Sequence, residues 1–275
     1  MMKNINIVGI LNLSPESFGS EAYHGIPKIL KRVGEMIEQG ATYIDVGAQS
    51  TRPGAVQLTL HEELNRLRGV IKEIKNKFPS ILVSIDTTRK ECVELSLSEG
   101  VDMINDISGG RFDKKIIRLI TGSKVKYVLT HSQGNFESLH KKYEYANIIE
   151  ELKNYFVEKI TELNKLGIFN ERIIIDPGIG FSKTGAQNIE IINRLEELNV
   201  LNLPVYIGVS RKKFIGEMIH ENDPLKRDVG TAVVQAYCLQ KGVSYVRTHN
   251  VEYMKQVLHV IGALEKGVLN LSITH

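Results

Sequence analysis

The sequence predicts an α/β protein that folds as a single (β/α)8 TIM barrel, with its functional site at the C-terminal ends of the strands. Its 275 residues are close to the roughly 250 that such a barrel needs. Short β-branched runs alternate with amphipathic stretches in about eight units, a pattern typical of a parallel sheet. No Ser/Gly/Pro-rich linker interrupts them, so we expect residues 1–275 to form one domain. The rival fold, a doubly wound open sheet, would carry GxGxxG after its first strand, and the sequence lacks that motif there.

The expected strands are short runs that are mostly apolar on both faces, as the strands of a buried parallel sheet are. In chain order they are Ile5–Leu11, Tyr43–Val46, Ile81–Ile85, Val101–Ile104, Val125–Leu129, Arg172–Ile175, Val205–Val209 and Tyr245–Val246. Eight strands are the number that a closed (β/α)8 barrel contains.

The expected helices lie between these runs. Ile26–Gln39 carries apolar residues at helical spacing and ends at Gly40. The same periodicity predicts helices over Leu60–Lys77, Arg89–Glu99, Lys114–Thr121, Asn147–Leu166, Gln187–Leu198, Val229–Lys241 and Glu252–Glu265. Gly100, Gly167 and Gly242 stand where helix C-caps belong.

Composition narrows the class of protein. With 35 basic and 32 acidic residues, the net charge of +3 is too balanced to indicate a nucleic-acid or membrane partner. We expect His140–Lys142 to be a solvated helix or loop face. Cys92 and Cys238 lack CxxC spacing, so small core residues are expected in place of a zinc site or disulfide. Met1–Leu13 lacks the apolar region of a signal peptide and no run has membrane-spanning length, which favours a cytoplasmic protein.

Polar side chains follow every expected strand, and the carboxyl ends of barrel strands meet on one face. They are Asn12, Asp45, Asp86, Asn105, His131, Asp176, Ser210 and Arg247. Taken singly, several have ordinary explanations: Asp86 could cap a helix, Asp176 could begin a turn, and His131 could be structural. Arg52–Gly54 could be a plain surface turn. These explanations do not account for a polar group at all eight ends.

The types of these residues indicate what they could bind. Asp86, Asn105 and Asp176 offer carboxylate and amide groups that could ring a flat heterocycle. The edge of a pterin, with several N–H donors and one carbonyl acceptor, matches such a set. We therefore expect a heterocycle subsite at the ends of the third, fourth and sixth strands.

A second set is suited to anions. Arg247 and His249 are two residues apart, so both side chains point the same way from one strand. Together with Asn12 they could hold an anion or a metal-bound diphosphate. Ser210–Lys212 lies at a strand-to-helix turn, where backbone N–H groups and the helix dipole favour a carboxylate or phosphate.

Seven segments in order resemble the dihydropteroate synthase family over nearly the whole chain. They are Gly9–Phe18, Ser50–Ala55, Ser84–Thr87, Ile104–Gly110, Asp176–Phe181, Ser210–Gly216 and Arg247–His249. The resemblance implies a transferase that joins 7,8-dihydropterin-6-ylmethyl diphosphate to 4-aminobenzoate, with C–O cleavage preceding attack by the amine. It also implies Mg²⁺ as cofactor, a homodimer, and membership of the class of enzymes that sulfonamides target.

The resemblance further implies a role for each matching residue. The catalytic residues would be Asp86, Lys212 and Arg247. The pterin would be bound by Asp86, Asn105, Asp176 and Lys212. The diphosphate would be bound by Asn12, Arg247 and His249, with Asn12 also the metal ligand. The 4-aminobenzoate would be bound by Thr51, Arg52, Pro53, Phe181 and Ser210.

The chain departs from the family pattern at several places. These are Glu16, Gly19–Ala22, Gln49, Thr130–Gln133 and Asn250. Gln49 and Asn250 each replace a common carboxylate, so altered kinetics or altered loop order is expected. We expect Ser14–His24 and Ala48–Val56 to be mobile loops that close over substrate, the alternative being plain surface connections.

Two other functions stay open. A methyltransferase that passes a methyl group from a folate to a corrinoid protein would share Asp86, Asn105 and Asp176. It would not need Ser50–Gly54 or Ser210–Gly216, and these segments argue against it. A paralogue that binds a pterin without turnover is the second alternative, motivated by the departures described above.

Overall fold

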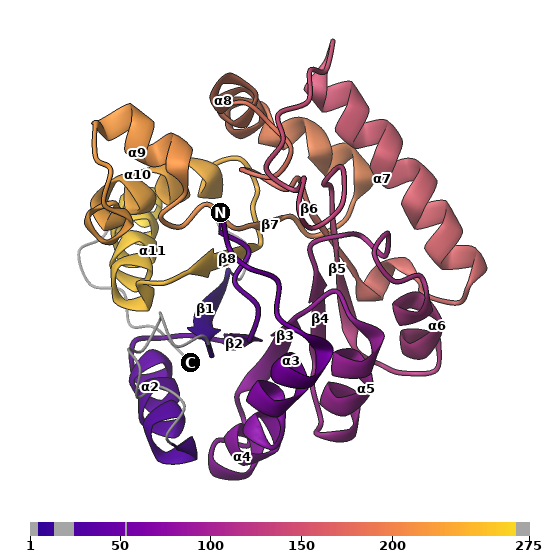
Figure 1. The fold of residues 1–275 in the computed structure, drawn as a ribbon. Coiled ribbons are helices and arrows are strands. Elements are labelled where there is room, and N and C mark those ends of the chain that lie inside the picture. The colour runs from indigo at the N-terminus through magenta and orange to yellow at the C-terminus, as the bar shows by residue number, and fades with distance from the viewer. Residues whose placement is uncertain (1–4, 14–24, 53, 268–275) are drawn as a thin grey trace.

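The computed structural model describes residues 5–13, 25–52 and 54–267. Eight parallel strands form one sheet in the order β6-β5-β4-β3-β2-β1-β8-β7, surrounded by helices (Figure 1). An isolated parallel bridge between Ile175 and Val205 joins β6 to the residue before β7. This bridge brings the two ends of the sheet together, and the predicted (β/α)8 barrel is confirmed.

Each expected strand is present, with ends shifted by one or two residues. The strands are β1 (Asn6–Asn12), β2 (Tyr43–Gly47), β3 (Leu82–Asp86), β4 (Met103–Asp106), β5 (Lys126–Thr130), β6 (Ile173–Asp176), β7 (Tyr206–Ile207) and β8 (Tyr245–Thr248). The seventh is much shorter than the predicted Val205–Val209, and Val205 contributes only the closing bridge. Most strands end later than predicted, so several of the polar residues belong to the strands themselves.

Helices follow the strands in the expected alternation. They are α2 (Ile26–Glu38), α3 (Leu60–Leu67), α4 (Val70–Lys77), α5 (Lys90–Ser98), α6 (Lys115–Thr121), α7 (Ile148–Lys165), α8 (Gly185–Asn193), α9 (Lys213–Ile219), α10 (Asp228–Leu239) and α11 (Val251–Lys266). Short 3-10 helices lie at η1 (Asn170–Arg172), η2 (Leu195–Leu201) and η3 (Pro224–Lys226). The periodicity did not indicate α9.

Two predicted helices differ from the structure. Leu60–Lys77 is not one helix, because Gly69 adopts a left-handed φ of 79° between α3 and α4. Its N–H donates to Glu99 Oε1 at 2.7 Å, which holds the break in place. The predicted Gln187–Leu198 begins earlier, after a capping box at Thr184, and continues past α8 as a 3-10 helix.

An apolar layer fills the interior of the barrel. Its buried members are Val8, Tyr43, Met103, Val128, Ile174, Tyr206 and Tyr245. The ring of Tyr245 meets Tyr43 edge-on, with centroids 5.8 Å apart, and stacks on Tyr206 at 6.1 Å. These side chains form a floor across the barrel, and residues farther along the same strands lie above it.

Other composition-based expectations can be compared with the described residues. Cys92 and Cys238 are both buried and free, as small core residues are. Within the described ranges, no helix combines the length and hydrophobicity needed to cross a bilayer. The same ranges hold no cluster of three or more His, Cys, Asp or Glu side chains arranged for a metal ion.

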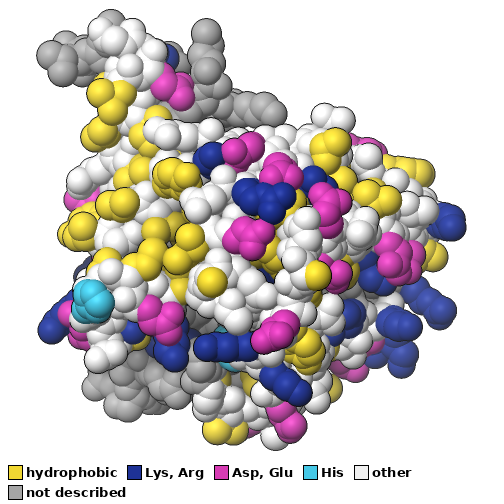
Figure 2. All heavy atoms as spheres, turned by 90° about the horizontal axis from the view of Figure 1, so that it is seen from above, with side chains coloured by type: hydrophobic (Ala, Val, Ile, Leu, Met, Phe, Trp, Pro, Cys, Tyr) yellow, Lys and Arg dark blue, Asp and Glu magenta, His cyan; other side chains and the backbone are white. Residues whose placement is uncertain are grey.

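One side of the molecule is rich in exposed apolar side chains. Hydrophobic residues gather on the left of Figure 2, the side on which Figure 1 places α9, α10 and α11. Val229 and Val233 on α10 are 67% and 64% exposed, and Leu264 on α11 is 78% exposed. We name Val229, Val233, Tyr237, Val260 and Leu264 the α10–α11 apolar face.

Candidate active site

The candidate site lies one layer above the apolar floor, toward the carboxyl ends of the strands. Asp45 follows Tyr43 by two residues on β2, and Arg247 follows Tyr245 by two on β8. Because side chains two apart on a strand point the same way, both project into the barrel. Asn105 and Asp176 stand in the same relation to Met103 and Ile174. The strand period therefore produces a polar layer directly above an apolar one.

Arg247 connects three strands at the centre of this layer. Its Nε donates to Asp45 Oδ2 at 2.6 Å, and its Nη2 donates to Asp86 Oδ2 at 2.7 Å. Asn105 Nδ2 donates to the same Asp45 oxygen at 3.2 Å. Three of the predicted residues are thus brought together, and the cap suggested as an ordinary role for Asp86 is not formed, since α5 has no side-chain cap.

Asp45 is the residue whose role the sequence analysis missed. It is fully buried and bonds both Arg247 and Asn105, so it orients two predicted substrate-binding side chains. The available signal was an acidic residue inside an otherwise apolar buried strand, because a buried carboxylate generally requires a partner. The sequence did not show which residue that partner would be.

Burial alters the protonation of the central carboxylate. Removal from water raises the pKa of Asp86 to about 7, a rise that Arg247 opposes and that Asp45 increases. Burial lowers the pKa of Arg247, but the two aspartates outweigh it and the net shift is upward. The guanidinium therefore stays charged, while Asp86 can change its protonation state near neutral pH.

Asp176 is held by the turn that follows β6. Gly178 N–H donates to Asp176 Oδ1 at 2.7 Å. Gly178 has a φ of 66°, and an added Cβ would lie 1.9 Å from the carbonyl oxygen of His131, so this position requires glycine. Burial raises the pKa of Asp176, whereas Lys212 and the Gly178 N–H lower it. The net shift of the pKa is upward, so the turn and the lysine offset only part of the effect of burial.

Lys212 lies over the same turn. Its Nζ donates to the carbonyl oxygen of Ile179 and lies 4.0 Å from the centre of the Phe181 ring. Burial lowers the pKa of Lys212 to about 8, although Asp176 opposes the change. An added Cβ on Gly180 would come within 2.7 Å of Lys212 Cδ, so the glycine allows the lysine stem to pass. Lys212 and Phe181, predicted for adjoining subsites, are in contact.

Ser210 and His249 are also in contact. Ser210 Oγ lies 2.9 Å from His249 Nδ1, and the backbone N–H of His249 donates to the same oxygen at 3.2 Å. Burial, together with the nearby charges of Arg211 and Arg247, lowers the pKa of His249 to about 3. His249 is therefore a neutral imidazole at physiological pH, able to hydrogen-bond an anion without carrying charge itself.

A buried lysine lies below the β6 turn. Lys183 is 5% exposed, and its Nζ contacts His131 Nδ1 at 3.0 Å and the carbonyl oxygens of Phe181 and Gly178 at 3.1 and 3.2 Å. Burial lowers the pKa of His131 to about 2, so its Nδ1 accepts from the Lys183 amino group, whose pKa burial lowers to about 7. His131 thus has the structural role that was its simpler explanation, and Lys183 braces the turn that carries Asp176.

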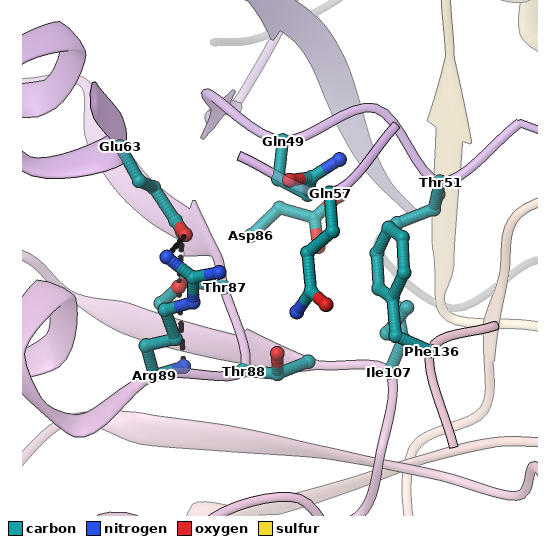
Figure 3. Close-up of a pocket in the computed structure, with 10 residues that line it drawn as sticks. All are labelled: Gln49, Thr51, Gln57, Glu63, Asp86, Thr87, Thr88, Arg89, Ile107 and Phe136. Carbon is teal, nitrogen blue, oxygen red and sulfur yellow. Dashed lines mark hydrogen bonds and ion pairs between the residues drawn. The ribbon is translucent and has the colours of Figure 1, made fainter. Parts of the chain in front are cut away.

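A narrow cavity opens at Asp86 (Figure 3). It is lined by Gln49, Thr51, Gln57, Glu63, Asp86, Thr87, Thr88, Arg89, Ile107 and Phe136. In Figure 3, Gln57 lies near Asp86, and Phe136 stands beside Thr51. A wider groove of about 520 Å³ adjoins it and shares Gln57 and Phe136. Neither side chain was a sequence-predicted site residue, because loop residues have no periodic signal.

Two of the departures from the family pattern, Gln49 and Asn250, act through amide groups. Gln49 Nε2 donates to the carbonyl oxygens of Ser50 and Val56 at 2.7 and 3.1 Å, and Leu58 N–H donates to Gln49 Oε1 at 2.6 Å. A carboxylate could accept the last bond but could not donate the first two. Gln49 therefore shapes the loop after β2 from within.

Asn250 likewise acts as both donor and acceptor. Its Oδ1 accepts from Tyr253 N–H at 3.0 Å and caps α11. Its Nδ2 donates to Asp228 Oδ2 at 3.1 Å, and Asp228 in turn binds Arg211. An aspartate here would face a second carboxylate.

The remaining predicted residues lie at the rim. Asn12 Oδ1 and Asp86 Oδ2 lie 3.8 and 3.7 Å from the point that a Cβ on Gly47 would occupy, so the two oxygens flank one site. Thr51 is half-buried and Arg52 is exposed. Pro53 lies outside the described residues, as do Ser14–His24 and with them Glu16 and Gly19–Ala22.

Known proteins resemble this chain over almost all of its length. Residues 8–249 match the family described as pterin binding enzyme. The dihydropteroate synthase of Synechocystis sp. is 38% identical over 264 residues, covering 95% of this chain and 91% of that protein. A structure of Xanthomonas albilineans dihydropteroate synthase with 4-aminobenzoic acid has a TM-score of 0.89 and 30% identity, covering 96% of this chain and 94% of that one. Another, in complex with 7,8-dihydropteroate, has a TM-score of 0.85 and 27% identity, with coverage of 96% and 95%.

Proposed function

The chain belongs to the pterin-binding enzymes and, within them, to the dihydropteroate synthase family, and we propose that it forms 7,8-dihydropteroate at the carboxyl face of its barrel. The observation that carries this proposal is the buried polar layer in which Arg247 bonds both Asp45 and Asp86. The substrates are 7,8-dihydropterin-6-ylmethyl diphosphate and 4-aminobenzoate, and the products are dihydropteroate and diphosphate.

The pterin subsite consists of Asp86, Asn105, Asp176 and Lys212. The support for this assignment is their shared depth above the floor and their chemical types. Ionised Asp86 and Asp176 accept hydrogen bonds from pterin N–H groups, and the Lys212 ammonium donates to the pterin carbonyl. The two carboxylates also stabilise positive charge on the pterin methylene when the leaving group departs.

The diphosphate subsite consists of Asn12, Arg247 and His249. Arg247 supplies a permanent charge, and neutral His249 supplies a hydrogen bond from its ring. In the reaction, the methylene C–O bond breaks and its electron pair leaves with the diphosphate. The amine nitrogen of 4-aminobenzoate then bonds to the methylene carbon and releases a proton to solvent.

Mg²⁺ fits the diphosphate subsite. The amide oxygen of Asn12 lies beside the Asp86 carboxylate across Gly47, and oxygen donors together with substrate phosphates are what Mg²⁺ prefers. Asn12 and the diphosphate oxygens would hold the ion, which would neutralise charge on the leaving group.

The aminobenzoate subsite consists of Thr51, Arg52, Pro53, Phe181 and Ser210. Its support is the contact of Phe181 with Lys212, which joins it to the pterin subsite. Phe181 offers an aromatic face to the aminobenzoate ring. Ser210, at the start of the turn into α9, is available to the substrate carboxylate.

The protein acts as a homodimer, through the α10–α11 apolar face. Val229, Val233 and Tyr237 recur every four residues, so they share one side of α10. Val260 and Leu264 have the same spacing on the neighbouring α11. Contiguous exposed apolar surface of this kind marks a protein contact site.

We also propose that residues 1–275 form a single domain and that the enzyme is cytoplasmic.

One assay tests the function against both alternatives. Purified protein is mixed with dihydropterin diphosphate, 4-aminobenzoate and Mg²⁺, and the release of diphosphate is followed together with dihydropteroate. Product formation that depends on both substrates is the expected result. Methyl transfer from a methylated folate to a corrinoid protein would support the methyltransferase, and tight pterin binding without product would support the non-catalytic paralogue.

A further inference from the structure

We propose that His140 is a positioning residue for 4-aminobenzoate, because it joins the two loops that carry Thr51 and Phe181. The inference rests on the proposed function, since that reaction defines the aminobenzoate subsite. His140 is half-buried between these loops, whereas its neighbours Lys141 and Lys142 are exposed. The expectation of a solvated face therefore holds for the two lysines and is wrong for the histidine.

The two ring nitrogens of His140 contact different loops. Nε2 lies 2.7 Å from the carbonyl oxygen of Thr51, which follows β2. A carbonyl oxygen only accepts, so Nε2 carries the hydrogen and donates. Nδ1 lies 3.3 Å from the carbonyl oxygen of Gly180, which follows β6. With its hydrogen on Nε2, the ring cannot also donate from Nδ1, so the bond to Thr51 is its hydrogen bond and the Gly180 carbonyl is a close contact. The imidazole thus contacts segments that lie 89 residues before it and 40 residues after it in the chain.

The ring also packs on the predicted aminobenzoate contact. The rings of His140 and Phe181 have centroids 5.8 Å apart and are tilted by 42°. The backbone before His140 is fixed to the same loop, because Ser182 N–H donates to the carbonyl oxygen of Leu139 at 2.8 Å. His140 thus belongs to the β6 side of the site, and its bond to Thr51 is the link across to the β2 loop.

That link reaches the middle of the loop after β2. Arg66 Nη1 donates to the carbonyl oxygen of Ala48 at one end, and Arg89 Nη2 donates to that of Leu58 at the other. Thr51 lies between them, on the stretch that faces the aminobenzoate subsite. Without the imidazole, this stretch loses its hydrogen bond to the β6 side. The pterin subsite is held by a separate network around Arg247, so its affinity should not change.

Steady-state kinetics of the full-length enzyme with Mg²⁺ tests the proposal. His140→Ala should raise KM for 4-aminobenzoate roughly tenfold, the effect of one well-placed hydrogen bond, with KM for dihydropterin diphosphate changed by less than about twofold. His140→Gln keeps an N–H donor near the position of Nε2 and should restore the KM. His140→Asn is one methylene shorter and should behave like the alanine variant. Lys142→Ala, an exposed change in the same segment, should match the wild type.

The outcomes separate this proposal from the proposed function. A wild-type protein that forms no dihydropteroate overturns the function and the inference with it. An active wild type whose His140→Ala variant keeps its KM for 4-aminobenzoate overturns the inference alone, as does an equal rise in both KM values. The Gln and Asn variants differ by one methylene, so their comparison decides the question even if the alanine variant does not fold.

Discussion

At the scale of single residues, buried charge is the property that most directly predicts behaviour. Asp86 and Lys212 both lie in the polar layer, with pKa values shifted toward each other, to about 7 and about 8. Enzymes commonly obtain acids and bases that titrate near neutrality in this way. In the proposed pterin subsite the shift has a further consequence, because each group would bind the pterin in its charged form.

The pH profile of kcat/KM for the pterin diphosphate should therefore be a narrow bell. Protonation of Asp86 below about pH 7 removes the carboxylate that accepts from the pterin, so activity falls toward acid. Deprotonation of Lys212 above about pH 8 removes the ammonium donor, so activity falls toward alkali. Rates measured from pH 5 to 10 test this. In Lys212→Arg the alkaline limb should move to higher pH, and an unmoved limb would contradict the assignment.

Asp176→Asn should weaken pterin binding by about 10- to 100-fold, since one acceptor of a charge-assisted hydrogen bond is lost. Calorimetric titration with the pterin substrate measures the change. Asp102→Asn serves as the control, because Asp102 pairs with Lys75 before β4, at the opposite end of the barrel. Near-normal affinity in Asp176→Asn would show that the pterin lies elsewhere.

Gln49→Glu should raise KM for 4-aminobenzoate roughly tenfold, because a carboxylate would face the carbonyl oxygens of Ser50 and Val56 that the amide now donates to. Gln49→Ala removes the same bonds without adding charge, so its effect should be smaller. Kinetics of the two variants beside the wild type decide the point. A glutamate variant that equals the wild type would mean that the loop does not need this amide.

At the scale of elements, local backbone geometry decides where helices stop. Four predicted C-cap glycines, at positions 40, 100, 167 and 242, all have left-handed φ values, between 85° and 99°. Gly69 belongs to the same class but was hidden inside a continuous apolar periodicity. Periodicity reports which side of a helix is buried, and it continues unbroken when two helices pack on the same neighbour.

Gly69→Ala should lower the free energy of unfolding by about 1–2 kcal/mol, the cost of a left-handed conformation for a residue with a Cβ. Urea denaturation measures the loss. Gly122→Ala is the matched control: its φ is −81° and an added Cβ would meet open space, so the change should stabilise the protein, by about 0.4–1 kcal/mol. Equal stability of the two variants would refute a strained break at Gly69.

At the scale of the whole molecule, the α10–α11 apolar face lies on the outside of the barrel and takes no part in its core. Its side chains are more than half exposed at Val229, Val233, Val260 and Leu264. Exposed apolar side chains do not stabilise the fold, whereas association with a second copy of the chain would bury them. The candidate site lies at the carboxyl ends of the strands, so the proposed dimer interface and the proposed chemistry use different surfaces.

Val233→Asp should convert the dimer to a monomer, because a carboxylate at the centre of the apolar face would be buried without a partner. Light scattering after size-exclusion chromatography gives the mass directly. Val157→Asp on α7, a valine that is 54% exposed, should leave the mass unchanged. A wild-type protein that is monomeric at micromolar concentration would rule out this interface.

Much of this protein could be determined from its sequence. Alternation of strand and helix patterns predicts the barrel, and the rule that parallel strands end on one face predicts that Asp86, Asn105, Asp176 and Arg247 converge. These inferences depend on order along the chain and on the period of two within a strand. Both are properties of sequence.

Tertiary structure alone decided which groups touch. Asp45 and Arg247 are 202 residues apart, and the separation of their side chains depends on how the eight strands close around the barrel. His140 was expected to face solvent, because nothing in its own segment specifies that two distant loops place carbonyl oxygens beside its ring. A sequence specifies positions along elements, whereas contacts between elements follow from closure and packing. Hence the sequence predicted candidates for the site, and the fold decided which of them lie in contact and with which partners.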